Sequence, residues 1–190
     1  GGRRVDFVAM LERILSLPGD FRLRLSSLEI TDLTERFLEF FARSGGRLCP
    51  SFHLPLQSGC DRVLGEMGRW YSSGFYARRV AALKERRPDA GLFTDVLVGF
   101  PGETEAEFEE TLGFIAGLGF SGLHVFPYSD RAGTPAAARA DRNPPASIRS
   151  RSERLRALDR ELRRAFAARG VGSRRRVVVE DRAGRCSALT

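Results

Sequence analysis

The sequence is poor in the residues that hold metals through sulfur. Its 190 residues include three cysteines, Cys49, Cys60 and Cys186, and no two of them stand in a CxxC or CxxxCxxC spacing. Because iron–sulfur clusters and structural zinc sites need closely spaced thiolates, the sequence predicts no metal ligands in this chain. An odd number of cysteines also disfavours a disulfide framework, so we expect a cytoplasmic protein with unpaired thiols.

Long apolar runs are missing as well. No run approaches the roughly 20 residues of a membrane-spanning helix, so we expect no contact with a membrane. The first residues, GGRRVD, contain neither an initiator methionine nor the apolar stretch of a signal peptide. We therefore expect the chain to begin inside a longer protein.

Lysine is almost absent, and the arginines that replace it are unevenly distributed. Lys84 is the one lysine among 31 basic residues. Positions 149–190 carry 13 arginines and 5 acidic residues, whereas positions 1–148 carry 18 basic and 19 acidic residues. A basic end on a neutral body indicates contact with a polyanion, most simply nucleic acid. The candidate contacts are Arg174, Arg175 and Arg176, and the alternative is a solvated helix face followed by a tail.

Strand and helix patterns alternate along the chain. Alternating or continuous apolar residues predict strands over 21–25, 52–57, 93–100 and 123–128. Helical spacing predicts helices over 33–41, 61–83 with an interruption near 69–74, 104–115 and 148–166. Capping boxes are expected at Asp32 with Glu35 and at Thr104 with Glu107. This order is typical of parallel strands with right-handed crossovers, either in an open doubly wound sheet or in part of a barrel.

The end of the chain predicts a second unit. A strand over 175–180 follows the glycines at 170 and 172 and opens a separate small β module. We therefore expect one α/β domain over residues 1–170 and the start of a second domain over 171–190.

Polar residues cluster where the predicted strands end, which is where both architectures bind ligands. Ser27, Gln57 and Ser58 lie at such ends. His53 and Gln57 share one face of the 52–57 strand, and polar side chains on a buried strand need partners. A barrel interior that holds a polar ligand would supply them; the alternative is a core hydrogen bond for His53.

Two charged residues are further candidates. Asp95 lies within an apolar strand, where a carboxylate must be paired or functional, and the alternative is a salt bridge to Arg22, Arg24 or Lys84. Arg69 stands among aromatic residues, where it could clamp a carboxylate or stack on a base. Its alternative is a surface position at a helix end.

The segment GFPGET at 99–104 joins a strand to a helix in the manner of a phosphate-binding loop. Glutamates at 103, 105, 107 and 109 crowd this helix start and would repel an anion, and the Walker pattern is missing. We predict a turn that approaches a neutral, flat group such as adenine.

Four strings together resemble one family. They are RLSSLE (24–29), CPSFHLPLQSGCDRVLGEMGRWY (49–71), TDVLVGFPGETEAEF (94–108) and LHVFPYSDRAGTPAA (123–137), and the resemblance extends from about residue 10 to 180. In this order they are similar to the radical S-adenosylmethionine methylthiotransferases. The LHVFPYS form is most similar to the subgroup that acts on N6-threonylcarbamoyladenosine in tRNA; relatives acting on isopentenyladenosine or on a ribosomal protein are the alternatives.

This resemblance implies a partial (β/α)6 barrel followed by a small RNA-binding β-barrel module of the TRAM kind. It also implies S-adenosylmethionine and two [4Fe-4S] clusters, whose cysteines should precede residue 1, so the chain alone should be inactive. A methylthio group would be added to the adenine ring of tRNA by radical chemistry, and we expect a monomer. A non-catalytic RNA-binding protein and a different radical oxidase remain competing hypotheses. The candidate cofactor-binding residues are Ser27, His53, Gln57, Ser58, Arg69, Asp95 and Phe126, with no catalytic residue in the chain.

Overall fold

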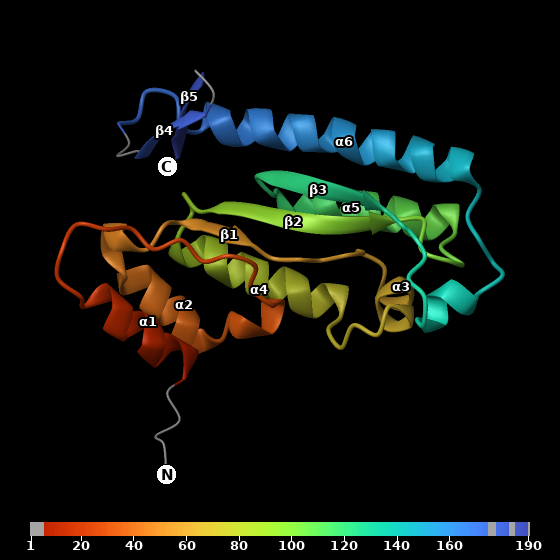
Figure 1. Ribbon diagram of the computed structural model, residues 1–190, viewed down its shortest axis with the longest axis horizontal. Coiled ribbons are helices and arrows are strands. Elements are labelled where there is room, and N and C mark those ends of the chain that lie inside the picture. The colour runs from red at the N-terminus through yellow and green to blue at the C-terminus, as the bar shows by residue number, and fades with distance from the viewer. Residues whose placement is uncertain (1–5, 175–177, 183–184, 190) are drawn as a thin grey trace, which may run out of the picture.

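The computed structural model describes residues 6–174, 178–182 and 185–189 (Figure 1). Its strands are β1 (Ser51–His53), β2 (Gly91–Val98), β3 (Gly122–Pro127), β4 (Val178–Arg182) and β5 (Arg185–Leu189). The α-helices are α1 (Phe7–Leu15), α2 (Glu35–Arg43), α3 (Asp61–Glu66), α4 (Ser73–Arg86), α5 (Glu105–Leu118) and α6 (Pro145–Ala168). Three short 3-10 helices cover Ile30–Asp32, Gly45–Arg47 and Pro135–Ala138.

A parallel sheet with strand order β1-β2-β3 forms the centre of the molecule. Each strand is followed by helix before the next begins, which is the crossover order that parallel strands require. The sequence predicted adjacent, parallel strands in chain order, and this arrangement is confirmed for β1, β2 and β3.

The first predicted strand lies beside β1 without forming a regular ladder. Leu23 bridges Leu48 and Ser27 bridges His53, both in the parallel sense. The backbone N–H of Leu28 donates to the His53 carbonyl at 2.9 Å. Residues 22–28 therefore lie where the first of the four predicted strands was expected. They contact β1 through isolated bridges and not through continuous pairing.

One face of the sheet packs against the helices and holds most of the core. On β2 the side chains of Leu92, Thr94, Val96 and Val98 are buried, and the alternate residues are only half-buried. From the helix side, the Tyr76 hydroxyl of α4 donates to the Leu54 carbonyl at 2.6 Å. Figure 1 shows α1, α2 and α4 together on one side of the sheet, with α6 running along β3 on the other. We call the opposite face, which carries Phe93, Asp95 and Leu97 of β2, the concave face of the sheet.

Side chains of α6 satisfy the outer edge of β3. The Leu123 N–H donates to Asp159 Oδ1 at 2.6 Å, and Arg163 Nη2 donates to the Leu123 carbonyl at 3.3 Å. Leu155 of the same helix is fully buried in the core. The long amphipathic helix predicted from the sequence is thus confirmed, and it covers the last strand of the sheet.

The helix start at Thr104 was predicted correctly, and the one near Asp32 was not. Thr104 and Glu107 form a reciprocal capping box at α5, as the sequence indicated. At α2 the cap is Thr34, whose side chain accepts from the Phe37 N–H. Asp32 instead closes the short turn that begins at Glu29, and Thr34 stands three residues before the first buried phenylalanine of α2, Phe37.

Two elements were not predicted. Helix α1 buries Val8 and Leu11, and its apolar stripe is too short to have predicted a helix. Strand β5 pairs antiparallel with β4, so the end of the chain forms a hairpin where a single strand was expected. Among the helices of the described part of the chain, none is both long and apolar enough to cross a bilayer.

Candidate ligand pocket and concave polar network

The concave face of the sheet collects polar side chains from all three strands. The register places Asp95 opposite His124 and Leu97 opposite Phe126. Because successive strand residues point to opposite faces, His124 and Phe126 share the face of Asp95. Leu54 and Leu56 are buried on the other face, as the sequence predicted.

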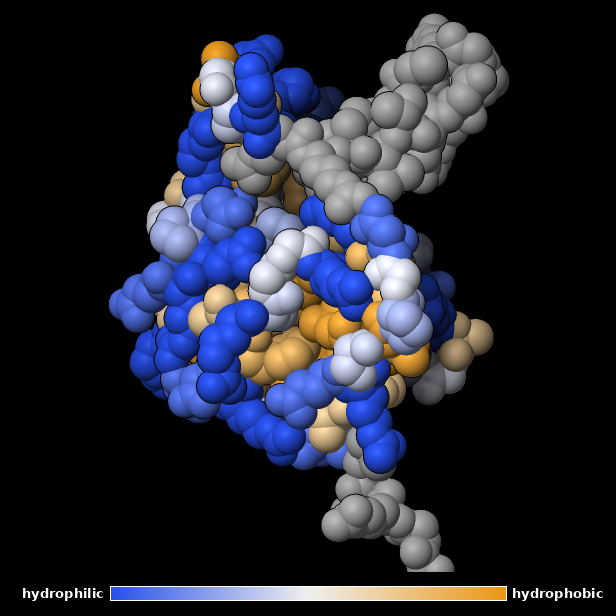
Figure 2. Space-filling view, turned by 90° about the vertical axis from the view of Figure 1, so that its left-hand side faces the viewer, coloured by the Kyte–Doolittle hydropathy of each residue, from blue (hydrophilic) through white to orange (hydrophobic). Residues whose placement is uncertain are grey.

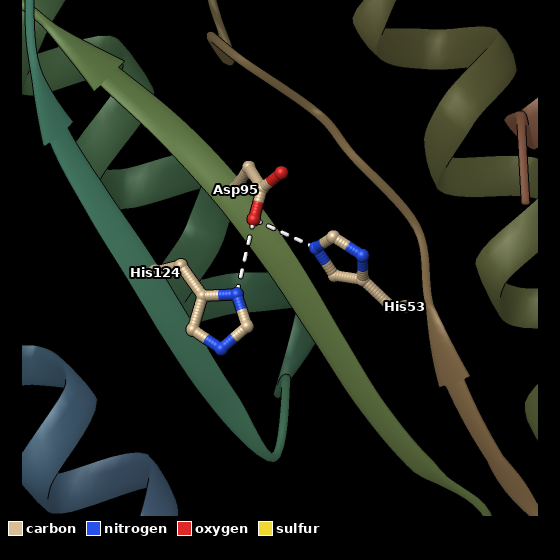
Figure 3. A group of neighbouring side chains, drawn as sticks. All are labelled: His53, Asp95 and His124. Atoms are coloured by element: carbon tan, nitrogen blue, oxygen red, sulfur yellow. Dashed lines mark hydrogen bonds and ion pairs between the residues drawn. The ribbon is translucent and has the colours of Figure 1, made fainter. Parts of the chain in front are cut away.

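A continuous hydrogen-bonded chain crosses this face (Figure 3). Ser27 Oγ lies 2.6 Å from His53 Nδ1, and His53 Nε2 lies 2.7 Å from Asp95 Oδ1. His124 Nδ1 lies 3.1 Å from the same Asp95 oxygen. Asp95 is thus paired with two histidines.

The salt bridge considered as the alternative for Asp95 does not form with Arg24 or Lys84. Arg24 donates to Ser51 Oγ at 3.3 Å, and Lys84 donates to the Gly119 carbonyl at 2.8 Å. The sequence pointed to a cation because arginine is abundant, whereas the neighbours that the strand register supplies are imidazoles. Burial lowers the pKa of Lys84 in its position on the far side of the sheet.

A second group of candidates lines a pocket of about 660 Å³ at the carboxyl ends of the strands. Gln57, Arg69 and Phe126 belong to it, together with Phe100 and Tyr128. Phe126 leaves about half of its surface exposed, and Arg69 lies 3.9 Å from the Glu29 carboxylate. Flat aromatic surface next to a guanidinium and an amide is a suitable lining for a nucleoside that carries a carboxylate.

Gln57 is held in an unusual backbone conformation. Its φ of 71° makes it the one non-glycine residue with a left-handed backbone in the described part of the chain. The conformation is fixed on both sides: the Gln57 N–H donates to the Asp95 carbonyl at 2.8 Å, and its carbonyl accepts from the Leu97 N–H at 2.9 Å. Such strain collects at functional sites, because the surrounding structure must be built to hold it.

Ser58 does not join either group. It is fully buried, its hydroxyl lies 3.1 Å from Thr111 Oγ1, and it accepts from the Cys60 N–H at 3.2 Å. A Cβ on the next residue, Gly59, would come within 2.9 Å of the Thr111 Cα. Glycine at this position therefore permits a close backbone approach to α5, and Ser58 lies on the helix side of the strand.

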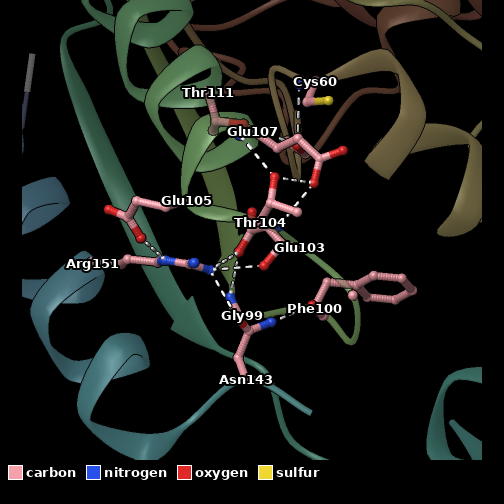
Figure 4. A network of polar contacts seen from close by, with 12 residues as sticks. Cys60, Gly99, Phe100, Glu103, Thr104, Glu105, Glu107, Thr111, Asn143 and Arg151 are labelled. Atoms are coloured by element: carbon pink, nitrogen blue, oxygen red, sulfur yellow. Dashed lines mark hydrogen bonds and ion pairs between the residues drawn. The ribbon is translucent and has the colours of Figure 1, made fainter. Parts of the chain in front are cut away.

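In the GFPGET turn a glutamate occupies the place where an anion would be expected in a phosphate-binding loop (Figure 4). The Glu103 carboxylate accepts from the Gly99 N–H at 2.9 Å and from Arg151 Nη1 at 3.0 Å, with both side chains almost fully buried. Burial raises the pKa of Glu103, and the Gly99 N–H and Arg151 oppose that rise. The backbone donor that a phosphate would need is thus already occupied.

The described thiols do not fit an iron–sulfur cluster. Cys49 and Cys60 are both buried and free, and they precede and follow the 51–57 segment at its two ends. Burial raises the pKa of Cys60, which disfavours the thiolate that a cluster needs. Cys186 lies on β5, where side chains are outside the described part.

The basic end is only partly described. Arg174 is exposed, whereas Arg175 and Arg176 lie outside the described residues. Two α6 arginines that contributed to the predicted basic surface have acidic partners: Arg151 is buried against Glu103, and Arg154 pairs at the surface with Glu105 and Glu109. The charge count alone therefore overstated the basic surface that is open to solvent.

Sequence reasoning missed His124 as a partner of Asp95 and Arg151 as the partner of Glu103. The signal for His124 was its place in the third strand, because parallel register brings equivalent positions of neighbouring strands together. Arg151 gave a weaker signal, since its helix position marked it only as one arginine among many.

The opposite end of the sheet has a hollow of about 490 Å³, lined by Phe21, Arg24, Arg47 and Phe166 among others. Figure 2 views the molecule from the side where the strands begin and shows an apolar area bordered by hydrophilic residues. Ligands of parallel α/β sheets bind at the carboxyl ends of the strands, so this hollow is not the candidate site.

A family profile and a solved structure both match this chain. Residues 3–115 match the profile of the radical SAM superfamily. The structure of coproporphyrinogen III oxidase (HemN) from Escherichia coli has a similar fold, with a TM-score of 0.64 and 17% identity over 82% of this chain and 37% of the oxidase. The parallel sheet, with a pocket at the carboxyl ends of its strands, is therefore part of a radical SAM fold.

Proteins of similar sequence indicate which family of this superfamily is the relevant one. The threonylcarbamoyladenosine tRNA methylthiotransferases MtaB of Thermotoga maritima and Bacillus subtilis are 37% and 41% identical over 90% and 86% of this chain. The tRNA-2-methylthio-N(6)-dimethylallyladenosine synthase of Nitrosospira multiformis is 38% identical over 94% of it. The chain belongs to the methylthiotransferase family of the radical SAM superfamily. It spans between 36% and 39% of the length of these three relatives.

Proposed function

We propose that the complete protein is a tRNA methylthiotransferase that modifies N6-threonylcarbamoyladenosine. The observation that carries this proposal is the similarity to MtaB of two organisms, at 37% and 41% identity. The dimethylallyladenosine synthases are similarly related, at 38% for Nitrosospira multiformis, and supply the second candidate substrate. Since tRNA is the substrate in both cases, we expect the protein to act in the cytoplasm, as a monomer.

In this proposal the pocket at the carboxyl ends of the strands binds S-adenosylmethionine. Phe126 offers a flat apolar surface to the adenine, and Arg69 offers a bidentate donor to the carboxylate. Gln57 presents an amide from a backbone that its neighbours hold rigidly. When bound, S-adenosylmethionine supplies the radical chemistry of the family. Because the described cysteines do not fit a cluster, both [4Fe-4S] clusters belong to parts of the complete protein outside this chain.

Two further placements belong to the proposal. The sheet and helices would form the second part of a (β/α)6 barrel over residues 1–170. The β4–β5 hairpin within 171–190 would begin the RNA-binding module, with Arg174, Arg175 and Arg176 contacting tRNA phosphates at the junction.

The helix before that junction supports the RNA contact. Four exposed arginines of α6 lie seven, four and four residues apart and so share one side of the helix, and none forms an ion pair with a described residue: Arg149, Arg156, Arg160 and Arg164. Four-residue steps along a helix are about 6 Å apart. We call these four residues the α6 basic stripe.

The experiment is a nucleoside analysis of tRNA treated with the complete, reconstituted enzyme and S-adenosylmethionine. We expect a methylthio group on tRNA that carries N6-threonylcarbamoyladenosine and none on tRNA that carries dimethylallyladenosine. If only the tRNA that carries dimethylallyladenosine is modified, the protein belongs to the subgroup that acts on that base. If neither tRNA is modified, the proposed function is wrong.

A further inference from the structure

The chain Ser27–His53–Asp95–His124 fixes the proton positions on both histidine rings. A carboxylate oxygen only accepts, so the ring nitrogens at 2.7 Å and 3.1 Å from Asp95 Oδ1 must both carry protons. In neutral His53 the other nitrogen, Nδ1, is then an acceptor for the Ser27 hydroxyl at 2.6 Å. In neutral His124 the proton on Nδ1 leaves Nε2 as an unprotonated acceptor.

That acceptor is exposed on the concave face. The His124 side chain is about half exposed, whereas the Asp95 and His53 side chains are 18% and 24% exposed. In Figure 3 the second ring nitrogen of His124 points away from Asp95. His124 also borders a hollow of about 380 Å³ together with Phe93, Arg24 and Arg163. Ser27 Oγ, both ring nitrogens of His53, Asp95 Oδ1 and His124 Nδ1 already have hydrogen-bond partners within this network, so Nε2 is the ring nitrogen left for a ligand.

A metal ion is the competing occupant of this cluster, because two imidazoles and a carboxylate are common ligands. Two features disfavour it. Both histidines lie within direct hydrogen-bond distance of a single carboxylate oxygen. Arg24 and Arg163 line the same hollow and raise the electrostatic cost of a further cation.

We propose that His124 binds the substrate base, accepting through Nε2 a hydrogen bond from an N–H or O–H donor on that base or its substituent. Ser27, His53 and Asp95 are positioning residues that hold the His124 ring in the form with a proton on Nδ1. The ligand class is a nitrogenous base with a donor at its edge, which the aromatic and guanidinium groups around the hollow also suit. This inference rests on the proposed function, since it assumes an RNA base as substrate.

The first test reads the ring nitrogens directly. His53 and His124 are the only histidines in the chain, so nitrogen-15 spectra of histidine-labelled protein contain just two rings. We expect Nδ1 of His124 to be protonated and Nε2 bare, with both forms populated in Asp95→Asn. A protonated Nε2 in the wild-type ring would overturn the inference. So would stoichiometric perturbation of both rings by added Zn²⁺, which would assign the cluster to a metal.

The second test compares two variants of the complete enzyme. His124→Asn keeps a donor for Asp95 and loses the outer acceptor, whereas His124→Gln places an amide oxygen where Nε2 was. We expect the KM for tRNA to rise about three- to tenfold in the asparagine variant, the value of one net hydrogen bond. In the glutamine variant we expect it to stay within about twofold of wild type.

Equal KM values in the asparagine variant and the wild type would overturn the inference and leave the proposed function intact. Equal losses in both variants would also overturn it, because the outer acceptor would then not be the feature that matters. A complete enzyme that modifies no tRNA would overturn the proposed function and the substrate contact with it. The nitrogen-15 spectra would still decide the ring forms.

Discussion

At the scale of single residues, the structure separates the candidates into two sets. Gln57, Arg69 and Phe126 line the pocket at the strand ends, and Ser27, His53 and Asp95 form the concave network. Sequence parity could predict that His53 and Gln57 share a face, because alternation is a property of any strand. The same parity puts Ser58 on the side of Leu54 and Leu56, which is the side toward α5 where it lies. Its place at a strand end was therefore a weaker guide than its parity. The left-handed backbone of Gln57 could not be predicted, because it depends on contacts with β2.

The pocket assignment predicts a loss of activity from two single substitutions. Gln57→Ala and Arg69→Ala in the complete enzyme should each lower kcat/KM at least tenfold, about 1.4 kcal/mol of transition-state stabilisation. Steady-state methylthiolation kinetics measure this. Arg78→Ala, which removes an exposed arginine of α4, is the matched control and should leave kcat/KM unchanged. Wild-type kinetics in both pocket variants would give Gln57 and Arg69 a purely structural role.

At the scale of elements, α5 and α6 are joined by ion pairs of very different burial. Arg151 reaches the buried Glu103, whereas Arg154 pairs with the exposed Glu105 and Glu109. Helix existence and the Thr104 capping box could be predicted from spacing, because both depend on residues close in sequence. The Arg151–Glu103 contact spans 48 residues, and only the packing of α6 on the sheet brings its partners together.

Arg151→Ala should destabilise the protein far more than Arg154→Ala. Removing Arg151 leaves a buried carboxylate without its partner, which costs about 3–5 kcal/mol. The Arg154 pairs are exposed, and their loss costs about 1 kcal/mol or less. Urea unfolding of the two variants provides the comparison, with the same helix and the same residue type in both. Equal destabilisation would mean that the Glu103 contact does not hold α6 in place.

The capping box of α5 predicts a pH dependence. Hydrogen bonds from Arg62 lower the pKa of Glu107 to about 2, below the ordinary value of 4.5. A lowered pKa in the folded state stabilises the protein above the unfolded value, and this contribution is lost as pH falls from about 5 toward 2. Water screens the half-exposed Arg62, so we expect a loss of about 1 kcal/mol. Unfolding free energies should fall less steeply over this range in Glu107→Gln, and parallel curves for the two proteins would contradict the prediction.

At the scale of the whole molecule, the chain combines a pocket at the carboxyl ends of its strands with an arginine-rich end. The order of parallel strands could be predicted because strict β–α alternation permits few topologies. The sequence shows how many arginines the end of the chain carries. It does not show which of them are exposed, because a buried arginine such as Arg151 and an exposed one such as Arg156 count the same.

Neutralising Arg174, Arg175 and Arg176 together in the complete enzyme should flatten the salt dependence of tRNA binding. Each lost phosphate contact changes the log–log slope by about 0.7 to 0.9, so we expect a change of roughly two to three. Binding should weaken equally for all tRNAs, because phosphate contacts do not read sequence. Titrations at several salt concentrations measure the slope. An unchanged slope would exclude these arginines from the RNA interface and leave the α6 basic stripe as the next surface to test.

The 190-residue chain by itself should bind no iron–sulfur cluster after anaerobic reconstitution. Its cysteines lack cluster spacing, and the two that the structure describes are buried at separate ends of one segment. Iron and sulfide analysis with visible absorption spectra checks this expectation. Stoichiometric iron with the absorbance of a [4Fe-4S] centre would contradict it.

The contacts that Asp159 and Arg163 make with Leu123 protect one edge of the sheet, the β3 edge, from pairing with a further strand. Exposed strand edges can recruit further strands, and on β3 these two side chains already occupy an edge N–H and an edge carbonyl. On the other side of the sheet, residues 22–28 meet β1 through isolated bridges only. If a further strand joins this sheet in a complete barrel, the edge next to residues 22–28 is therefore the one on which it would pair. Helix α6 thus acts as a built-in guard of the β3 edge against pairing with another chain.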